Sequence, residues 1–200
     1  MDEMVQHSTP RALTEAEIAD VTEDFAHPAK NAINAGFDGV ELHGANGYLN
    51  QFIDSQANNR THGYGGSLPR RLLFLREVVE GVVAVVGEDR IGVRLAPLTT
   101  LQGAVDDTPQ ATYLAAARML DERCLYIPIA EADWDDAPEM PTTFKEALRL
   151  IYRGTMIYSG KYTAERTEQA VQNGWADLIG LVAPSLPIPI SRRDFNGAWR

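Results

Sequence analysis

Short apolar segments alternate with amphipathic segments along most of this chain, and this alternation limits the folds open to it. Strands are predicted at residues 39–42, 91–95, 125–129, 155–158 and 177–182. Helices are predicted at residues 14–34, 67–87, 108–121, 141–151 and 163–174. Apolar strands separated by helices predict βα units in a parallel sheet. Both a doubly wound sheet and a piece of a (β/α)8 barrel fit this order.

The polar residues at the strand ends favour the barrel. No Gly-x-Gly-x-x-Gly follows the first strand, so a dinucleotide-binding fold has little support. His43, Arg94 and Gly160 each stand at or just past the carboxyl end of a predicted strand. In a TIM barrel these ends form the catalytic face.

Residues 39–49, which read GVELHGANGYL, place an imidazole, an amide and a phenol directly after the first strand. His43, Asn46 and Tyr48 could belong to a polar loop that satisfies its own backbone groups. Alternatively, they could form a clamp for a carbonyl or an anion beside a proton donor. A tyrosine with an ordinary pKa of about 10 is protonated at neutral pH and can donate.

Several segments resemble the Old Yellow Enzyme family of flavin oxidoreductases. Residues 35–49 (AGFDGVELHGANGYL) resemble its catalytic segment, and residues 59–67 (NRTHGYGGS) resemble its Arg-Thr-Asp-x-Tyr-Gly-Gly-Ser motif. Residues 90–97 (RIGVRLAP) resemble its Arg-x-Gly-x-Arg-x-Ser-Pro strand. Residues 10–13 (PRAL) resemble the segment that leads into its third barrel helix. The resemblance runs from about residue 10 to residue 179.

This resemblance implies a (β/α)8 barrel that binds FMN, takes hydride from NAD(P)H and passes it to an activated alkene. It implies that His43 and Asn46 bind the substrate carbonyl or nitro oxygen and stabilise its developing charge. It also implies that Tyr48 protonates the α-carbon and that Arg94 lies against the flavin pyrimidine edge, where a cation favours the anionic reduced flavin.

The resemblance also places the FMN phosphate at residues 159–162. Gly160 would allow the backbone to approach the phosphate closely. Lys161 would add charge there or remain solvated. Arg60 and the turn at residues 64–67 are expected to hold the catalytic loop in place. The acidic run Glu131, Asp133, Asp135 and Asp136 around Trp134 is interpreted as a solvated loop rather than a metal site.

The chain departs from the family pattern in three places. The family's first three βα units have no counterpart, so we expect an incomplete barrel of about five parallel βα units at residues 1–180, with open sheet edges that favour self-association. His62 stands where the family has Asp, which puts a loop salt bridge in doubt. Residues 181–200 form a tail that lacks the family's phosphate-binding Gly-Arg.

Residues 181–192 (LVAPSLPIPISR) can be obtained by a one-base shift of DNA that encodes the family text Gly-Arg-Pro-Phe-Ile-Ala-Asn-Pro-Asp-Leu-Pro. A frameshift near codon 181 is therefore hypothesised, and the coding DNA tests it. Losing a bidentate arginine removes roughly 1.5–3 kcal/mol of phosphate binding. We therefore expect weak or no FMN retention.

The net charge and the distribution of apolar residues argue against nucleic-acid-binding, membrane-spanning and secreted proteins. A formal net charge of -10 disfavours a nucleic-acid partner. No apolar run approaches the roughly 20 residues that span a bilayer, and the acidic N-terminus does not resemble a secretory signal. Cys124 lies in an apolar stretch and is expected to be buried. A cytoplasmic location is expected by elimination.

Three functional interpretations remain. The first is an FMN-dependent ene reductase whose activity is impaired in this chain. The second is a non-catalytic half-barrel that is unstable alone or pairs with another chain. The third is a different (β/α)8 enzyme, such as a Schiff-base aldolase, but no lysine lies on a predicted strand and the His-x-x-Asn-x-Tyr pattern would go unexplained. Flavin binding and enone reduction separate the first two.

Overall fold

The computed structural model describes residues 11–101, 104–131 and 138–181, and its framework is one parallel sheet. The strands are β1 (Val40–Gly44), β2 (Ile91–Leu95), β3 (Tyr126–Ala130), β4 (Thr155–Gly160) and β5 (Leu178–Leu181). They lie side by side in chain order, β1-β2-β3-β4-β5, and every neighbouring pair is parallel. A doubly wound sheet would reverse its order at a switch point. The continuous order is that of a barrel wall.

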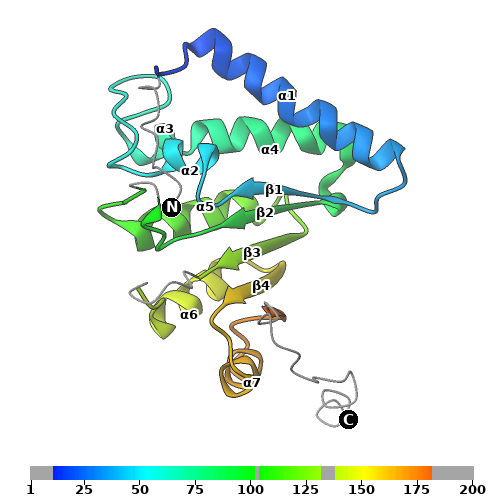
Figure 1. Ribbon diagram of the computed structural model, residues 1–200, viewed down its shortest axis with the longest axis vertical. Helices are drawn as coiled ribbons and strands as arrows, with labels where there is room; N and C mark the ends of the chain where they lie inside the picture. Colours follow the sequence, from blue (N-terminus) through cyan, green and yellow to red (C-terminus); the bar gives the residue numbers. More distant parts are fainter. Residues whose placement is uncertain (1–10, 102–103, 132–137, 182–200) are drawn as a thin grey trace, which may run out of the picture.

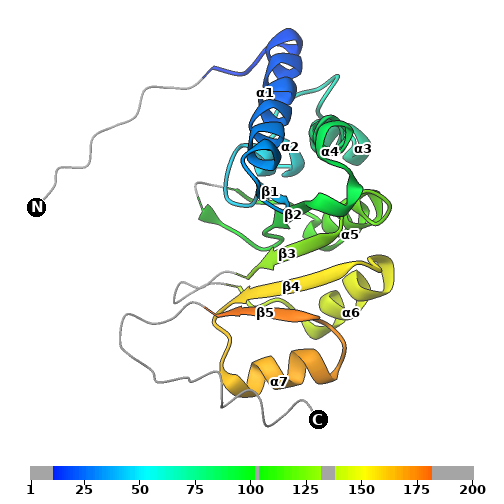
Figure 2. The same ribbon diagram turned by 90° about the vertical axis from the view of Figure 1, so that its right-hand side faces the viewer.

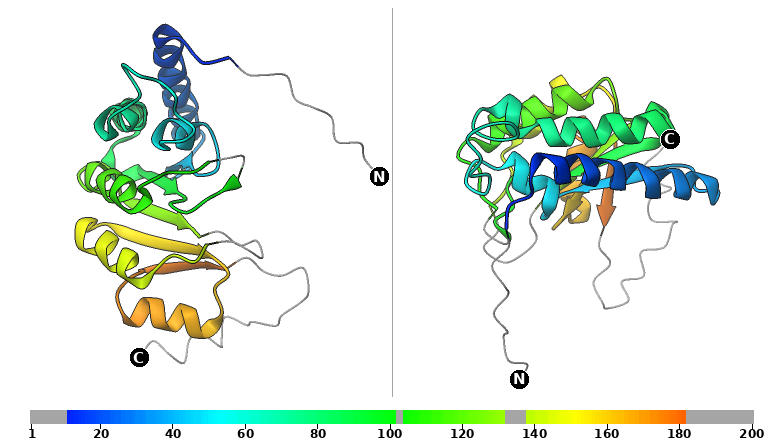
Figure 3. Two further views of the ribbon diagram at one scale, coloured as in Figure 1. Left: turned by 90° about the vertical axis from the view of Figure 1, so that its left-hand side faces the viewer. Right: turned by 90° about the horizontal axis from the view of Figure 1, so that it is seen from above.

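Helices connect and cover these strands. They are α1 (Glu15–Asn34), α2 (Tyr48–Ile53), α3 (Leu68–Arg71), α4 (Leu73–Val86), α5 (Pro109–Leu120), α6 (Thr142–Ile151) and α7 (Ala164–Gln172), with a 3-10 turn η1 (Glu88–Arg90). Helix α1 packs lengthwise on α4 (Figure 1). Helices α4, α5 and α6 lie on one side of the sheet, as two opposite views show (Figures 2 and 3).

The two faces of the sheet differ in burial. The helix-covered face holds the core, to which β2 contributes Ile91, Val93 and Leu95, all fully buried. Alternation along each strand places the other residues on the opposite face. We call this the inner face, and it carries Glu41, His43, Gly92, Arg94, Tyr126, Pro128, Ala130, Thr155, Ile157, Ser159, Leu178 and Gly180.

Most predicted elements are present, with shifted boundaries. Thr14 and Glu17 form the predicted capping box of α1, and the Thr163 hydroxyl caps α7. The helix predicted at residues 67–87 was wrong as a single element, because the chain forms α3 and then α4 with Leu72 between them. Cys124 is buried as expected, and burial raises the pKa of its thiol to about 12. The predicted tail, Leu181 excepted, lies outside the described residues.

Candidate functional site

His43 and Arg94 lie next to each other on the inner face, near the carboxyl ends of their strands. The two residues are direct partners in the parallel register of β1 and β2. Partners in a parallel pair present their side chains on the same face. The register therefore brings together two residues that are 51 positions apart in the chain. His43 is exposed and Arg94 is half-buried, so both can meet a ligand.

Glu41 modifies the charge that Arg94 presents. It precedes His43 by two residues on β1, so it shares the inner face. The Nε of Arg94 donates to Oε1 of Glu41 at 2.6 Å. A guanidinium has five N–H donors, and this ion pair uses the one on Nε. The terminal nitrogens keep donors for a further acceptor, but the carboxylate offsets much of the positive charge.

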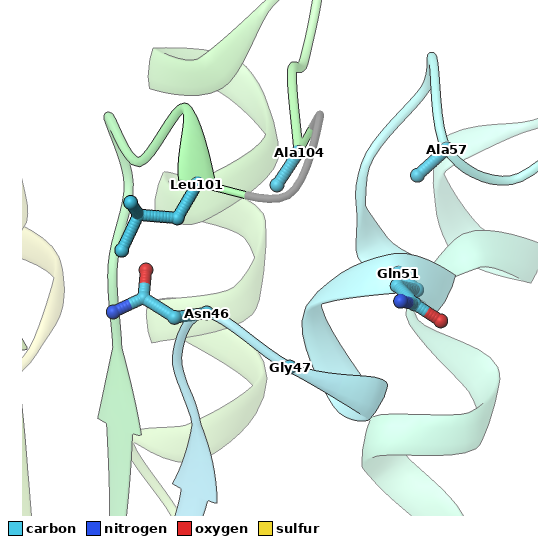
Figure 4. A pocket seen from close by; sticks show the side chains of 6 residues that line it. All are labelled: Asn46, Gly47, Gln51, Ala57, Leu101 and Ala104. Carbon is cyan, nitrogen blue, oxygen red and sulfur yellow. The ribbon is translucent and has the colours of Figure 1, made fainter. Parts of the chain in front are cut away.

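Asn46 follows β1 in a left-handed backbone conformation, with φ 54°. Asparagine tolerates this region better than most residues because its short side chain bonds locally. Its Oδ1 is buried and has no hydrogen-bond partner among the described residues. The amide lies below Leu101 at a pocket of about 240 Å³ that Gly47, Gln51, Ala57 and Ala104 also line (Figure 4). A buried, unpaired polar atom beside a pocket is a candidate ligand contact.

Tyr48 is the first residue of helix α2, two residues after Asn46. The backbone therefore brings His43, Asn46 and Tyr48 to one end of β1. The structure describes the backbone of Tyr48, and the role of its phenol stays a prediction.

The long segment after α2 is held by polar contacts, in agreement with the structural role expected for Arg60. Nη2 of Arg60 donates to the carbonyl of Leu13 at 2.6 Å, and its guanidinium lies 5.4 Å from the centroid of the Phe52 ring. The hydroxyl of Tyr64 donates to Glu77 on α4 at 2.9 Å. Burial, followed by this acceptor, raises the pKa of Tyr64 to about 12. These contacts connect the loop to the segment just before α1 and to α4.

A buried polar network that the sequence did not predict fixes α2 from the other side. Nδ2 of Asn50 donates to Asp54 at 2.6 Å, and the hydroxyl of Tyr113 on α5 donates to Oδ1 of Asn50 at 2.6 Å. Beside them, Arg71 forms an ion pair with Asp106 at 2.5 Å and donates to the carbonyl of Ile53. The pKa of Asp54 is raised to about 7, chiefly by burial and then by the charge of Asp106.

Gly160 ends β4 with φ 144°, a conformation that side chains rarely adopt. A Cβ at this position would lie 2.9 Å from the carbonyl oxygen of Glu131. The N–H of Tyr162 donates to the carbonyl of Gly160 at 2.9 Å, which closes a turn, and α7 starts directly after Thr163. Lys161 is the exposed residue of this turn. The turn and the His43–Arg94 pair lie at the same end of the parallel sheet.

Glu131 corrects the prediction of a solvated acidic loop. Its side chain is 7% exposed and forms an ion pair with Lys145 at 2.5 Å. The rest of that acidic run, residues 133–136, lies outside the described residues. The prediction was wrong for Glu131 because a carboxylate next in sequence to other acids resembled a surface residue, whereas two cations from later helices surround it.

Comparison with known proteins gives consistent similarities. The family described as "NADH:flavin oxidoreductase / NADH oxidase family" matches residues 1–189. The 12-oxophytodienoate reductase 1 of Oryza sativa subsp. japonica is 37% identical over 217 residues, which cover 96% of this chain and 55% of that protein. Another rice relative is 41% identical over 204 residues, or 51% of its length. The chain thus spans about half the length of the curated relatives it matches.

Solved structures show the same relationship. Morphinone reductase superposes with a TM-score of 0.83 at 40% sequence identity. The match covers 87% of this chain and 47% of the morphinone reductase chain. One similar structure is of morphinone reductase in complex with tetrahydroNAD. An old yellow enzyme homologue from Zymomonas mobilis superposes with a TM-score of 0.87 at 31% identity, over 100% of this chain and 57% of its own. These matches confirm the partial TIM barrel and the predicted resemblance.

The match to residue 189 includes part of the segment in which a frameshift was hypothesised, and that hypothesis stays a prediction. Among the described residues, no helix combines the length and the apolar character that a membrane crossing requires.

Proposed function

Since the chain belongs to the NADH:flavin oxidoreductase / NADH oxidase family, we propose that it carries the substrate-binding half of an FMN-dependent ene reductase. The substrates would be α,β-unsaturated carbonyl or nitro compounds, and NAD(P)H would be the reductant. The proposal concerns the chain's own residues, because the chain spans about half of its curated relatives.

One observation carries this proposal: an imidazole and a guanidinium are register partners on one open face, at the end of the sheet where Asn46 and Tyr48 follow. A structural salt bridge would explain Arg94 and Glu41 alone. It would not explain why His43 stays exposed beside them, or why the Oδ1 of Asn46 is buried without a partner among the described residues.

The residues present fit a flavin nucleotide. Arg94 offers guanidinium donors on the inner face, suited to the acceptor-rich pyrimidine edge of the ring. Gly160 lets the backbone of its turn approach a phosphate, and the start of α7 favours an anion at this point. When bound, FMN supplies the hydride that it has received from the nicotinamide.

The side chains then divide the remaining work. His43 and Asn46 donate hydrogen bonds to the substrate oxygen and stabilise the negative charge that develops as hydride reaches the β-carbon. For Asn46 this requires Nδ2 to face the substrate, and the two ends of an amide exchange by rotation. Tyr48 gives its phenolic proton to the α-carbon, so that one hydride and one proton saturate the double bond.

The test is flavin binding followed by enone reduction. The purified chain is incubated with FMN, and consumption of 2-cyclohexenone is measured anaerobically with NADH or NADPH. The phenylalanine variant Tyr48→Phe should lose about 100-fold or more in the rate of alkene reduction, as expected for removal of a general acid. Its NAD(P)H-driven flavin reduction should stay intact, because that step needs no substrate proton.

Tyr64→Phe is the matched control, because it removes the hydroxyl of a tyrosine in the segment after α2, and this hydroxyl donates to Glu77 on α4. It should leave the ratio of alkene reduction to flavin reduction unchanged. Failure of the wild-type chain to bind FMN, or equal effects of the two variants on that ratio, would overturn the proposal.

A further inference from the structure

A buried ion cluster lies directly behind the turn of Gly160. Oε1 of Glu131 accepts from Nζ of Lys145 at 2.5 Å and from the hydroxyl of Tyr162. Oε2 of Glu131 pairs with Nη2 of Arg166 at 3.3 Å. The Lys145 side chain is only 6% exposed and lies over the rings of Tyr158 and Tyr162. Burial, and then the bond to Glu131, raises the pKa of Tyr162, which therefore stays protonated.

The side chain of Arg166 connects the cluster to the backbone of the turn. Nη1 of Arg166 donates to the carbonyl of Lys161 at 2.6 Å, while its Nη2 is held by Glu131. The N–H of Glu131 also donates to the carbonyl of Ser159 at 2.8 Å, and the carbonyl oxygen of Glu131 lies 2.9 Å from the position that a Cβ of residue 160 would take. Glu131 thus fixes the strand that enters the turn, and through Arg166 it fixes the peptide that leaves Lys161.

A fixed carbonyl at Lys161 also holds the conformation of the turn. Peptide groups are planar, so this contact fixes the peptide between Lys161 and Tyr162, whose N–H donates to the carbonyl of Gly160 and closes the turn. The two cations and one carboxylate also leave the cluster with a positive charge behind the turn. A rigid turn presents its backbone to an anion in one conformation, the charge attracts the anion, and neither feature requires Arg166 to touch it.

We propose that Arg166, held by Glu131, is a positioning residue for the phosphate end of a bound flavin nucleotide. This inference rests on the proposed function, and it adds the residues that shape the phosphate contact. A purely structural role in anchoring α7 would affect stability alone. A positioning role would affect the affinity for FMN. It would leave the affinity for riboflavin unchanged, because riboflavin has the same ring system without the phosphate.

The experiment measures the dissociation constants of FMN and riboflavin by quenching of flavin fluorescence in about 0.15 M salt, the physiological ionic strength. Wild-type protein should prefer FMN. Arg166→Met should reduce this preference about tenfold, which corresponds to about 1.4 kcal/mol. Arg166→Lys keeps the charge, but one ammonium group is too compact to replace the fork that joins Glu131 and the Lys161 carbonyl. It should therefore also reduce the preference.

Arg149 offers a matched control at the opposite end of the same sheet. It pairs with Asp177 at 2.9 Å and donates to the carbonyl of Gly154 at 3.0 Å, so it joins a carboxylate and a backbone carbonyl in the same way. Arg149→Met should lower the free energy of unfolding and leave the preference for FMN unchanged.

The possible failures are distinct. Wild-type protein that binds neither flavin would overturn both the proposed function and this inference. Wild-type protein that prefers FMN, with the same preference in both Arg166 variants, would overturn the positioning role alone. Equal losses of preference in Arg149→Met and Arg166→Met would also overturn it, because they would show a general effect of stability.

Discussion

At the scale of single residues, Glu41 offsets part of the charge that Arg94 would present to a flavin in the proposed function. The two side chains are each about a third exposed and lie 2.6 Å apart. A cation near the flavin pyrimidine stabilises the reduced anion, and a carboxylate beside that cation weakens the effect. We infer that the pair sets the reduction potential as well as the position of the arginine.

Replacing Glu41 by Gln should raise the reduction potential of bound FMN. The amide keeps an acceptor for Nε of Arg94 and removes the negative charge. Loss of roughly 1 kcal/mol of opposing charge interaction corresponds to about 20 mV for a two-electron couple. Anaerobic titration against a redox dye measures the potential. Glu80→Gln removes the carboxylate of the Glu80–Arg123 surface pair and should leave the potential unchanged. A lower potential in Glu41→Gln would contradict the inference.

Gly160 limits the geometry of the proposed phosphate turn. Gly160→Ala should cost about 1–3 kcal/mol of stability, because alanine is strained at φ 144° and its Cβ would meet the carbonyl of Glu131. It should also reduce the preference for FMN over riboflavin, since the turn must shift. Gly174→Ala is the control: its φ is 69° and a Cβ there meets nothing within 4 Å. Urea unfolding and flavin fluorescence measure both effects, and equal flavin preferences in the two variants would contradict this role.

At the scale of elements, helix α2 owes its position to buried polar contacts. The helix has six residues, too few to be stable by itself. Asn50 and Asp54 are almost fully buried, and they connect α2 to Tyr113 on α5. Since Tyr48 starts this helix, the network also fixes the backbone of the proposed proton donor.

Asp54 should make the stability of the chain depend on pH. Its pKa is raised to about 7 in the folded state, against about 3.9 for an ordinary Asp. Between about pH 4 and pH 7 the folded state therefore holds the proton more tightly, and stability falls as the pH rises through this window. The slope is at most about 1.4 kcal/mol per pH unit. Asp54→Asn should flatten the profile, as measured by urea unfolding at several pH values.

Asp107 is the control for this experiment. It is an exposed carboxylate that accepts hydrogen bonds from Ser55 and Gln56, the two residues that follow Asp54. Asp107→Asn should keep the wild-type slope. The lowered pKa of Asp106, which Arg71 and the N–H of Thr108 hold down, affects stability below about pH 4 and so outside the window. A wild-type stability that rises from pH 5 to pH 7 would contradict the assignment.

The elements with local signals could be predicted from the sequence. Three helix starts were predicted from local signals, and the structure reproduces each within one residue. These signals are the capping pair Thr14 and Glu17, Thr163, and Pro109 after Thr108. Helix α2 was not predicted, because six residues contain too little periodicity to distinguish it from loop. Strand β1 runs to Gly44, past the predicted end, because its length follows from pairing with β2.

The candidate site likewise contains residues that could be selected from the sequence and residues that could not. His43 and Arg94 could be selected as candidates from the sequence because polar residues at strand ends contrast with their apolar neighbours. The Glu131 cluster was missed because its charged members come from the residue after β3, from α6 and from α7, and each resembles an ordinary surface charge. Lys145 offered one signal: it lies between Phe144 and Leu148 on the buried side of α6.

At the scale of the whole molecule, the sheet is open. In the chain as far as it is described, β1 and β5 each have a strand on one side only. Leu178 on β5 is 56% exposed and belongs to the inner face, beside Ile157. Exposed strand edges and apolar sheet faces favour pairing with another chain. We therefore propose that the isolated chain associates with itself through this part of the sheet.

Replacing Leu178 by Lys should shift the isolated chain toward the monomer, because a charge on the inner face of an edge strand opposes sheet pairing. Leu150→Lys provides the matched control, since Leu150 is 86% exposed but lies on helix α6, away from the sheet edge. Light scattering coupled to size exclusion, over a range of protein concentrations, measures the molar mass. The molar mass of the wild-type protein and of Leu150→Lys should increase with protein concentration. The increase should be smaller for Leu178→Lys. A wild-type chain that stays monomeric throughout, or equal shifts in the two lysine variants, would show that association does not proceed through β5.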